Sequence, residues 1–389
     1  MIKKKKIGIF GSTGSIGKNT LEVIKKDIKN FDVIFLSANT NYKLLLKQAK
    51  NFKVKNIIIH DLKTYKIVKS KVKKNKINVF FNVNNIEKII KKKIDYTMCS
   101  ISGLEGLHST LQAISFSKNI AIANKESIIC GWPLIKKKLK KFNTNFVPID
   151  SEHFSIWSLT KEYRNKDIKE IIITASGGPF LNYNLSKLKN VKPYNATKHP
   201  KWSMGKKISV DSSTLMNKVF ETIEAFRMFD FDFDKYRILI HPESYVHAIV
   251  KFNNGLIKFL IHDTDMKIPI FNSLYFNEIK TYDNLGINHK KISNLKFFNV
   301  NKKKFPSINI LKKIPKKHTL FETVLISAND ELVSLFLGNK IKYLDMHKSL
   351  IKIINDKKIK KEYSNLPFSM NSIVKLNKLV RLKTRALSV

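Results

Sequence analysis

The feature that most constrains the fold is a glycine-rich turn between a short apolar segment and a helical one. Residues 6–10 predict a strand, and residues 19–29 carry apolar side chains at helical spacing. Between them lies GSTGSIG at 11–17, whose G-x-x-G-x-x-G spacing excludes a P-loop. A strand, a glycine-rich turn and a helix N-terminus form the geometry that holds a pyrophosphate on backbone N–H groups. This pattern predicts a dinucleotide loop, with a tight turn that binds no ligand as the alternative.

The rest of the first 150 residues alternates strand-like and helical segments. Strands are predicted at 31–36, 56–59, 95–100, 119–123 and 145–149, and helices at 42–51 and 64–71. Alternation of this kind is typical of a parallel sheet with helices on both faces. We therefore predict an α/β protein whose residues 1–150 form a Rossmann-like, doubly wound, dinucleotide-binding domain.

From residue 151 the pattern changes. Strand-like segments at 168–174 and 237–250 and an amphipathic helix at 213–228 predict a central α+β domain, catalytic and dimerising, over 151–276. Residues 277–310 are rich in Asn and Lys and predict a linker, and residues 311–389 predict a C-terminal helical domain with helices at 323–337 and 344–354.

The excess of basic residues raises the question of a nucleic-acid partner. The chain has 73 Lys plus Arg against 30 Asp plus Glu, for a formal charge of +43, but Arg occurs only at positions 164, 227, 237, 381 and 385. Sequence-reading nucleic-acid binders depend on the bidentate Arg fork, and the lysines here are scattered beside many Asn and Ile. We interpret the excess as compositional drift and expect no specific nucleic-acid partner.

Composition also bounds the compartment. The two cysteines, Cys99 and Cys130, fit a reducing environment, and no apolar run approaches the roughly 18 residues that span a bilayer. We expect a globular cytoplasmic protein without a membrane partner.

The cofactor preference follows from the end of the second strand. NAD-specific sites place an acid there to bond the ribose 2′-hydroxyl. Residues 36–41 read LSANTN and contain no acid, and Lys43 is the nearest cation. The absence of a carboxylate favours NADP.

Acidic residues follow the strand predicted at 145–149. In an extended chain Asp150 and Glu152 point the same way, so both carboxylates could bind one hard cation such as Mg²⁺ or Mn²⁺. The helix at 213–228 carries a polar stripe that includes Asn217, Lys218 and Glu221, preceded by Asp211-Ser212-Ser213 as a predicted cap. A solvated helix face is the alternative interpretation of the stripe.

Three further segments favour a ligand site. Ser176-Gly177-Gly178 ends a predicted strand and allows close backbone approach to a phosphate, or forms a structural turn. The loop that contains His199 and Trp202 is bounded by Pro and Gly, as mobile lids often are. Asn124-Lys125-Glu126 follows another strand, at the sheet edge where α/β proteins bind ligands.

These segments together resemble the 1-deoxy-D-xylulose 5-phosphate reductoisomerases. The matching strings are GSTGSIG at 11–17, ANKES at 123–127, PIDSEH at 148–153, ASGGPF at 175–180, HPKWSMGKKISVDSSTLMNK at 199–218, IHPESYVHAIV at 240–250 and DMKIPI at 265–270. SANDE at 327–331 resembles the family's NAANE. The chain departs from the family pattern at Asn39-Thr40, at Lys201, at Glu243 and in the shortened lead-in to SANDE.

The resemblance implies a homodimeric enzyme that uses NADPH and a divalent ion (Mg²⁺, Mn²⁺ or Co²⁺) on a phosphorylated sugar. The implied metal ligands are Asp150, Glu152 and Glu221. The implied catalytic residues are Lys125, Glu152, His199 and Trp202. The implied substrate-binding residues are Lys125, Ser151, Ser176, His199, Ser212, Asn217, Lys218 and Glu221. The implied cofactor-binding residues are Thr13, Gly14, Ser15, Ile16, Asn39, Asn41, Asn124, Glu126 and Gly205.

Three other hypotheses stay open at this stage. A plain NAD(P)-dependent dehydrogenase needs only the signals of the first domain. A basic nucleic-acid-binding protein would concentrate its lysines on one face. An inactive relative of the family would tolerate loss of the acidic residues.

Overall fold

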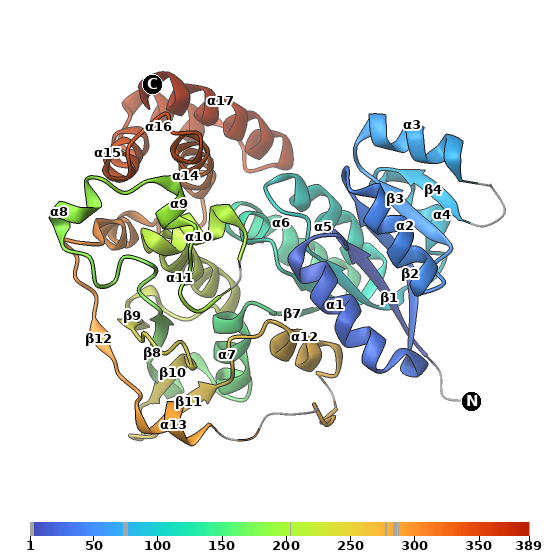
Figure 1. Cartoon of the computed structure of the whole chain (residues 1–389), viewed down its shortest axis with the longest axis horizontal. Helices are drawn as coiled ribbons and strands as arrows, with labels where there is room; N and C mark the ends of the chain where they lie inside the picture. The colour runs from blue at the N-terminus through green and yellow to red at the C-terminus, as the bar shows by residue number, and fades with distance from the viewer. Residues whose placement is uncertain are drawn as a thin grey trace. The chain divides into compact units, whose positions relative to one another are not determined.

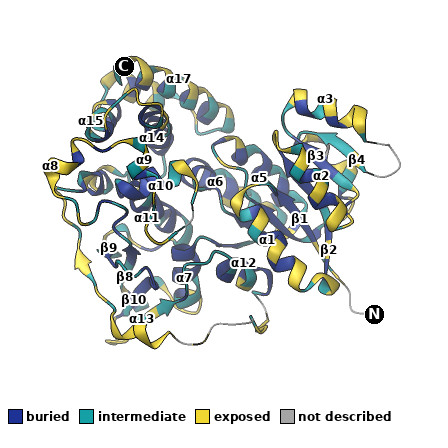
Figure 2. Cartoon of the chain, viewed as in Figure 1, coloured by how far each residue is buried: buried dark blue, intermediate teal, exposed yellow. Residues whose placement is uncertain are grey.

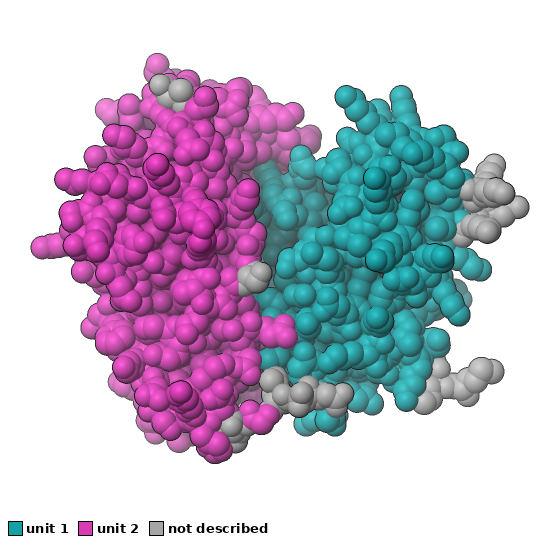
Figure 3. All heavy atoms as spheres, in the orientation of Figure 1, with its two compact units in different colours: residues 1–128, 133–150, 266–283 teal, residues 129–132, 151–265, 284–389 magenta. Residues whose placement is uncertain are grey.

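The computed structural model describes residues 4–72, 77–202, 204–276, 278–282, 286 and 288–388. The chain divides into two compact units, coloured in Figure 3. Unit 1 comprises residues 1–128, 133–150 and 266–283, and unit 2 comprises residues 129–132, 151–265 and 284–389. Each unit is built around its own β-sheet.

Unit 1 holds a seven-stranded sheet in the order β4-β3-β2-β1-β5-β6-β7, with every neighbouring pair parallel. The strands are β1 Lys5–Phe10, β2 Phe31–Ala38, β3 Asn56–Ile59, β4 Asn78–Phe81, β5 Ile94–Cys99, β6 Ser117–Ile122 and β7 Asn145–Val147. The order reverses direction at β1, so β1 and β5 form the switch point at which doubly wound sheets bind ligands. The predicted Rossmann-like fold is confirmed, with β4 as a strand that the sequence pattern did not reveal.

Helices connect these strands (Figure 1). They are α1 Ser15–Lys26, α2 Tyr42–Asn51, α3 Leu62–Lys71, α4 Ile86–Ile89, α5 Glu105–Ser115 and α6 Lys125–Phe142, with residues 129–132 of α6 assigned to unit 2. A later segment, α12 Lys267–Leu274, returns to pack against α1. The Tyr96 hydroxyl lies 2.8 Å from Ser273 Oγ, and Tyr275 donates to Asp27 at 2.5 Å, so buried polar contacts as well as apolar packing hold this returning helix.

The core of unit 1 lies between the sheet and its helices. Ile7 and Ile9 of β1 are completely buried and pack with Leu21 and Ile24 of α1 and with Ile270 of α12. Each such side chain contributes roughly 1.5–3 kcal/mol by leaving water. Figure 2 shows the resulting pattern, with β1 and β2 largely buried, the edge strand β4 only partly buried, and helices exposed along their outer faces.

Unit 2 contains a mixed five-stranded sheet in the order β11-β10-β8-β9-β12. The strands are β8 Ile168–Ala175, β9 Tyr236–Ile240, β10 Val246–Phe252, β11 Ile257–Ile261 and β12 Phe298–Asn299. Helices α7 Ser151–Thr160 and α11 Met216–Phe229 pack against this sheet. The predicted strand-like segment 237–250 is wrong as one element, because the turn that contains Pro242 and Ser244, at φ +53°, separates β9 from β10.

The helix predicted at 213–228 corresponds to α11, Met216–Phe229, and only its predicted start is wrong. Residues Lys206–Ser213 form α10, and α11 begins only at Met216. Leu215 between them has φ +60°, a left-handed conformation that is costly for a branched residue. Its side chain is 2% exposed, so burial offsets that cost, and the Met216 N–H donates to Thr214 Oγ1 at 3.3 Å.

The remaining elements of unit 2 are mostly helical. They are α8 Leu185–Leu188, α9 Pro193–Ala196, α13 His289–Ser293, α14 Phe321–Leu337, α15 Tyr343–Ile354, α16 Lys357–Asn365 and α17 Met370–Ser388. The helices predicted at 323–337 and 344–354 correspond to α14 and α15. Residues 277, 283–285 and 287 of the predicted linker lie outside the described residues, and the described remainder includes α13, β12 and a 3-10 helix, Pro306–Lys313. Among the described residues no helix has the length and apolar character needed to cross a membrane.

Gly17 offers a test of the loop geometry. A Cβ at this position would lie 2.4 Å from the Gly11 carbonyl oxygen, and we expect Gly17→Ala to lower the free energy of unfolding by about 2 kcal/mol in urea titrations. Gly14→Ala is the matched control, because its Cβ would meet that same oxygen at 3.4 Å. Gly17 lies inside α1, where Ala is intrinsically more favourable than Gly, so a loss of stability in Gly17→Ala must come from the close approach. Equal urea midpoints for the two variants would therefore contradict the close approach.

Candidate active site

The glycine-rich loop of unit 1 is held by hydrogen bonds to β2. The Ser12 N–H donates to the Ser37 carbonyl at 2.9 Å, and the Gly11 N–H donates to Ser37 Oγ at 3.0 Å. Gly14 is the N-cap of α1 and supplies no side-chain hydrogen bond to the first turn. The first-turn N–H groups of α1 are therefore capped by no side chain at this position, as a pyrophosphate-binding helix requires.

The other predicted cofactor residues of unit 1 lie at strand ends. Asn39 and Asn41 are exposed just beyond β2, and Asn41 caps α2 by accepting from the Leu44 N–H at 3.4 Å. Asn124 caps α6 by accepting from the Ser127 N–H at 2.5 Å, and its amide donates to the Gly103 carbonyl at 2.7 Å. Thr13, Gly14, Ser15 and Ile16 are exposed or half-buried in the loop, and Glu126 is buried in α6. Gly205, in unit 2, is the N-cap of α10.

Three carboxylates form the acidic centre. Asp150, Glu152 and Glu221 each present an oxygen within 4.8 Å of the others. Asp150 ends the second segment of unit 1 and is joined by one peptide bond to Ser151, the first residue of α7. Lys125 of unit 1 pairs with Asp150 at 2.5 Å. The predicted metal ligands are thus brought together.

The route by which they converge differs from the expectation. Glu152 is not on an extended segment but in the first turn of α7, and Glu221 projects from the second turn of α11. The predicted cap is also wrong, since Asp211, Ser212 and Ser213 end α10 and the N-cap of α11 is Leu215. The first turn of α7 therefore takes the place of the expected extended segment, whereas Glu221 lies on the expected helix.

Lys218 lies between two of these carboxylates. Its ammonium is 2.6 Å from Glu152 Oε1 and 2.6 Å from Glu221 Oε2, with a side chain 8% exposed. Burial alone lowers the pKa of Lys218, but the two carboxylates outweigh burial and raise the pKa above its usual value. Lys218 therefore stays charged and reduces the repulsion between Glu152 and Glu221.

Neighbouring polar groups fix the orientation of the carboxylates. Asn217 Nδ2 donates to Glu221 Oε1 at 2.5 Å, and Ser151 Oγ donates to Glu152. His153 Nε2 lies 2.9 Å from the Glu221 carbonyl and ties α7 to α11. His153 was not among the predicted site residues, although its place directly after Glu152 was a usable signal.

Ser176 and His199 form a second cluster in unit 2. His199 Nδ1 accepts from the N–H groups of Trp202 at 2.9 Å and Lys201 at 3.1 Å. Nε2 therefore carries the proton and donates to Ser176 Oγ at 3.0 Å. The Gly178 N–H also donates to Ser176 Oγ, at 3.1 Å, so this oxygen accepts from two described donors and neither bond uses its own proton.

The charge state of His199 follows from its surroundings. Burial, aided by the positive charge of Lys218, lowers the pKa of His199 to about 4. The ring is neutral at pH 7, which agrees with the tautomer that the two backbone donors impose. The indole ring of Trp202 lies edge-on against His247, with ring centroids 6.0 Å apart.

Ser212 is brought close to this cluster by the second glycine of the Ser176 turn. Gly178 has φ +66°, and a Cβ there would lie 2.7 Å from the Ser212 carbonyl oxygen. Only glycine permits this approach. Ser176 and the last turn of α10 are therefore adjacent, and Ser212 is 9% exposed.

The residues fit both a hard cation and a dinucleotide. Three carboxylate oxygens are the ligand set that Mg²⁺ or Mn²⁺ takes in proteins. The glycine loop, which lacks a side-chain cap at Gly14, fits a pyrophosphate. This combination defines a class, the α/β oxidoreductases that reduce a substrate held by a metal ion.

Comparisons with known proteins identify the family within that class. The family model described as 1-deoxy-D-xylulose 5-phosphate reductoisomerase matches residues 7–131, and two models of the reductoisomerase C-terminal domain match residues 146–229 and 261–383. The Pelagibacter ubique (strain HTCC1062) reductoisomerase is 53% identical over 387 residues, covering 99% of this chain and 100% of that relative. The Clostridium botulinum (strain Loch Maree / Type A3) reductoisomerase is 35% identical, covering 97% of each chain. The chain belongs to the 1-deoxy-D-xylulose 5-phosphate reductoisomerase family.

Solved structures agree. The Zymomonas mobilis reductoisomerase in complex with NADPH superposes with a TM-score of 0.88 at 30% identity, covering 99% of each chain. A DOX-P reductoisomerase in complex with NADPH, fosmidomycin and magnesium superposes with a TM-score of 0.90 at 30% identity, covering 98% of each chain. The three-part fold predicted from the sequence is the fold of these enzymes.

The carboxylate centre predicts a metal-dependent stabilisation. We expect Mn²⁺ to raise the melting temperature of the wild-type chain and of Glu224→Gln, but not of Glu221→Gln, in thermal shift assays. Glu224 is the matched control because it is a carboxylate on the same helix, 1% exposed, and outside the metal group. An equal response of Glu221→Gln to Mn²⁺ would show that the ion binds elsewhere.

The lowered pKa of His199 predicts acid sensitivity. Between the ordinary histidine pKa of 6.5 and about 4 the unfolded chain binds a proton that the folded chain does not. The stability contribution of neutral His199 is thus complete above pH 6.5 and is lost as the pH falls towards 4. With solvent screening allowed for, we expect His199→Asn to remove about 2 kcal/mol of this pH dependence, measured by urea unfolding from pH 7 to 4.5. Parallel stability profiles for the two proteins would refute a buried neutral ring.

Proposed function

We propose that this chain converts 1-deoxy-D-xylulose 5-phosphate into 2-C-methyl-D-erythritol 4-phosphate, a step of the methylerythritol phosphate route to isoprenoids. The observation that carries the proposal is the meeting of Asp150, Glu152 and Glu221 in a chain that also has the dinucleotide loop of its family. A bound Mg²⁺ or Mn²⁺ supplies a Lewis acid for the rearrangement of the sugar skeleton, and NADPH supplies the hydride that reduces the resulting aldehyde.

The acidic centre binds the ion and orients the sugar. Asp150, Glu152 and Glu221 are the proposed metal ligands, and Lys125 and Ser151 bind the polar oxygens of the substrate. Lys125 reaches Asp150, and Ser151 donates to Glu152, so both residues already lie beside the proposed ligands. Without the ion, the single charge of Lys218 offsets part of the negative charge of Glu152 and Glu221.

The substrate phosphate is bound in unit 2. The proposed phosphate ligands are Ser176, Ser212, Asn217 and Lys218. In support, Ser176 Oγ accepts from His199 and Gly178, and neither bond uses the hydroxyl proton, which could therefore be donated to a phosphate. A neutral His199 orients Ser176 without adding a charge that would titrate with the substrate. His199 and Trp202 belong to the loop that closes over the sugar and excludes water.

The cofactor is bound by the loop of unit 1. Thr13, Gly14, Ser15 and Ile16 contact the pyrophosphate side of NADPH, and Asn124, Glu126 and Gly205 contact the rest. Asn39 and Asn41 face the ribose 2′-phosphate, where an acid would repel it. The domain boundaries at 150, 276 and 310 remain part of this proposal. Two free, buried cysteines favour a reducing compartment, and we propose the cytoplasm.

Homodimerisation is a further part of the proposal. The edge strand β11 exposes Ile257 and Phe259, at 52% and 44% of their surface, and Leu256 before it is 55% exposed. An edge strand with adjacent exposed apolar side chains is typical of an interaction surface. A second copy of the chain would bury these side chains.

An activity assay tests the proposed reaction. We expect the purified chain to oxidise NADPH in the presence of 1-deoxy-D-xylulose 5-phosphate and Mg²⁺, and to stop when EDTA is added. We expect Glu152→Gln to lower kcat by on the order of 10²–10⁴-fold, because a ligand of the reacting centre is lost. Undiminished turnover in EDTA would instead support a plain dehydrogenase.

The dimer is tested by light scattering after size exclusion. The chain has a mass of 45.1 kDa, and we expect the wild type to elute at twice this value. Phe259→Lys, which puts a charge in the exposed apolar face, should elute as a monomer, whereas Leu382→Lys, a change at an exposed residue of α17, should not. A wild type of single-chain mass would refute the dimer.

A further inference from the structure

The SANDE segment of α14 has no role in the reaction proposed above, yet its polar residues are buried. Asn329 is 2% exposed and Glu331 is 1% exposed. Buried polar groups are costly unless they are hydrogen-bonded, so their partners indicate what the segment holds. Two residues of the segment, Asn329 and Asp330, reach α10, the helix that follows the His199 loop and contains Ser212 in its last turn.

Asn329 bonds to the last turn of α10. Its Nδ2 donates to Asp211 Oδ1 at 2.7 Å, and Asp211 is 3% exposed. Asp211 directly precedes Ser212, a proposed phosphate ligand. A buried carboxylate is stable only with donors around it, so Asn329 fixes where Asp211 lies and hence the backbone of its neighbour.

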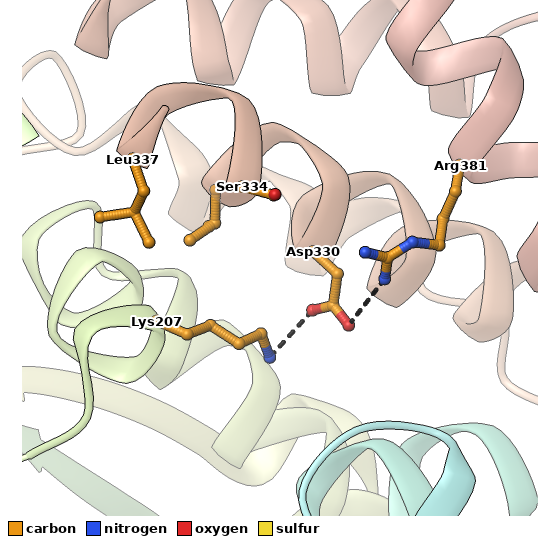
Figure 4. A pocket seen from close by; sticks show the side chains of 6 residues that line it. Lys207, Asp330, Ser334, Leu337 and Arg381 are labelled. Atoms are coloured by element: carbon orange, nitrogen blue, oxygen red, sulfur yellow. Dashed lines mark ion pairs between the residues drawn. The ribbon is translucent and has the colours of Figure 1, made fainter. Parts of the chain in front are cut away.

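Asp330 bonds to the first turn of α10, as Figure 4 shows. Its Oδ1 lies 2.9 Å from Lys207 Nζ, and its Oδ2 lies 3.7 Å from Arg381 of α17. These side chains line a cavity of about 230 Å³. The side chains of Lys207 and Arg381 are more than a third exposed, so these ion pairs contribute little and the buried Asn329–Asp211 bond carries more.

The end of α10 is held from two further sides. Tyr343 of α15 donates its hydroxyl to the Ser213 carbonyl at 2.6 Å, and the Ser212 carbonyl lies against Gly178. The last turn of α10 is therefore confined between α14, α15 and the Ser176 turn. We infer that Asn329 is a positioning residue for phosphate recognition, which acts through Asp211 on Ser212. This inference rests on the proposed function for the identity of the substrate.

The test exchanges donor and acceptor. Asn329→Asp sets a carboxylate against Asp211, and we expect KM for 1-deoxy-D-xylulose 5-phosphate to rise about tenfold, with kcat within about twofold of wild type. Inorganic phosphate should bind more weakly by the same factor, measured by its protection against thermal unfolding. The double variant Asp211→Asn/Asn329→Asp restores one donor and one acceptor and should recover both values.

A milder variant and a matched control separate positioning from stability. Tyr343→Phe keeps the ring and removes only the hydroxyl bond to Ser213, so KM should rise about threefold. Glu331→Gln changes an equally buried residue of the same helix whose described partners are Arg381 and Arg385 of α17, and it should lower the melting temperature without changing KM.

The outcomes distinguish this inference from the proposed function. An unchanged KM in Asn329→Asp and Tyr343→Phe, or a double variant that does not recover, overturns the inference. If the wild type does not turn over the sugar phosphate, the proposed function fails. Phosphate protection of Asn329→Asp and of the double variant then still decides whether Asn329 positions an anion site.

Discussion

The structure around the active site depends on the ion pairs that the buried Lys218 forms with two carboxylates. Lys218 lies 2.6 Å from both Glu152 and Glu221, and without its charge the two acids would repel each other in a region of low dielectric. Glu152 comes from α7 and Glu221 from α11, so the same contact joins the two helices that pack on the sheet of unit 2. The residues of the cation site therefore also hold α7 and α11 together in the absence of the ion.

The second constraint is geometric and falls on backbone. The left-handed Leu215 separates α10 from α11. As a result Ser212 and Lys218 lie on two different helices. Gly178 lets the Ser176 turn approach Ser212 closely. In one continuous helix Ser212 and Lys218, six residues apart, would not share a helix face.

Much of the fold and the site could be predicted from local patterns. Alternating apolar segments predicted the parallel sheet, and the strings around Asp150, Ser176 and Lys218 predicted a family that the comparisons confirmed. The predictions that were wrong concerned the local backbone conformation of single segments. Glu152 was expected on an extended segment and Asp211 at a helix start, because neither burial nor φ can be read from residue types alone.

By itself the sequence determined the identity of the chemistry, because residue types in order are what a carboxylate centre and a dinucleotide loop require. The excess of lysine, by contrast, determined nothing about it. The tertiary structure alone decided which groups meet: Asn329 with Asp211, Tyr343 with Ser213, and His199 with Ser176. These contacts join residues 23 to 130 positions apart. No local pattern encodes them, since they form only when the helices pack, and burial makes an unpaired polar group costly.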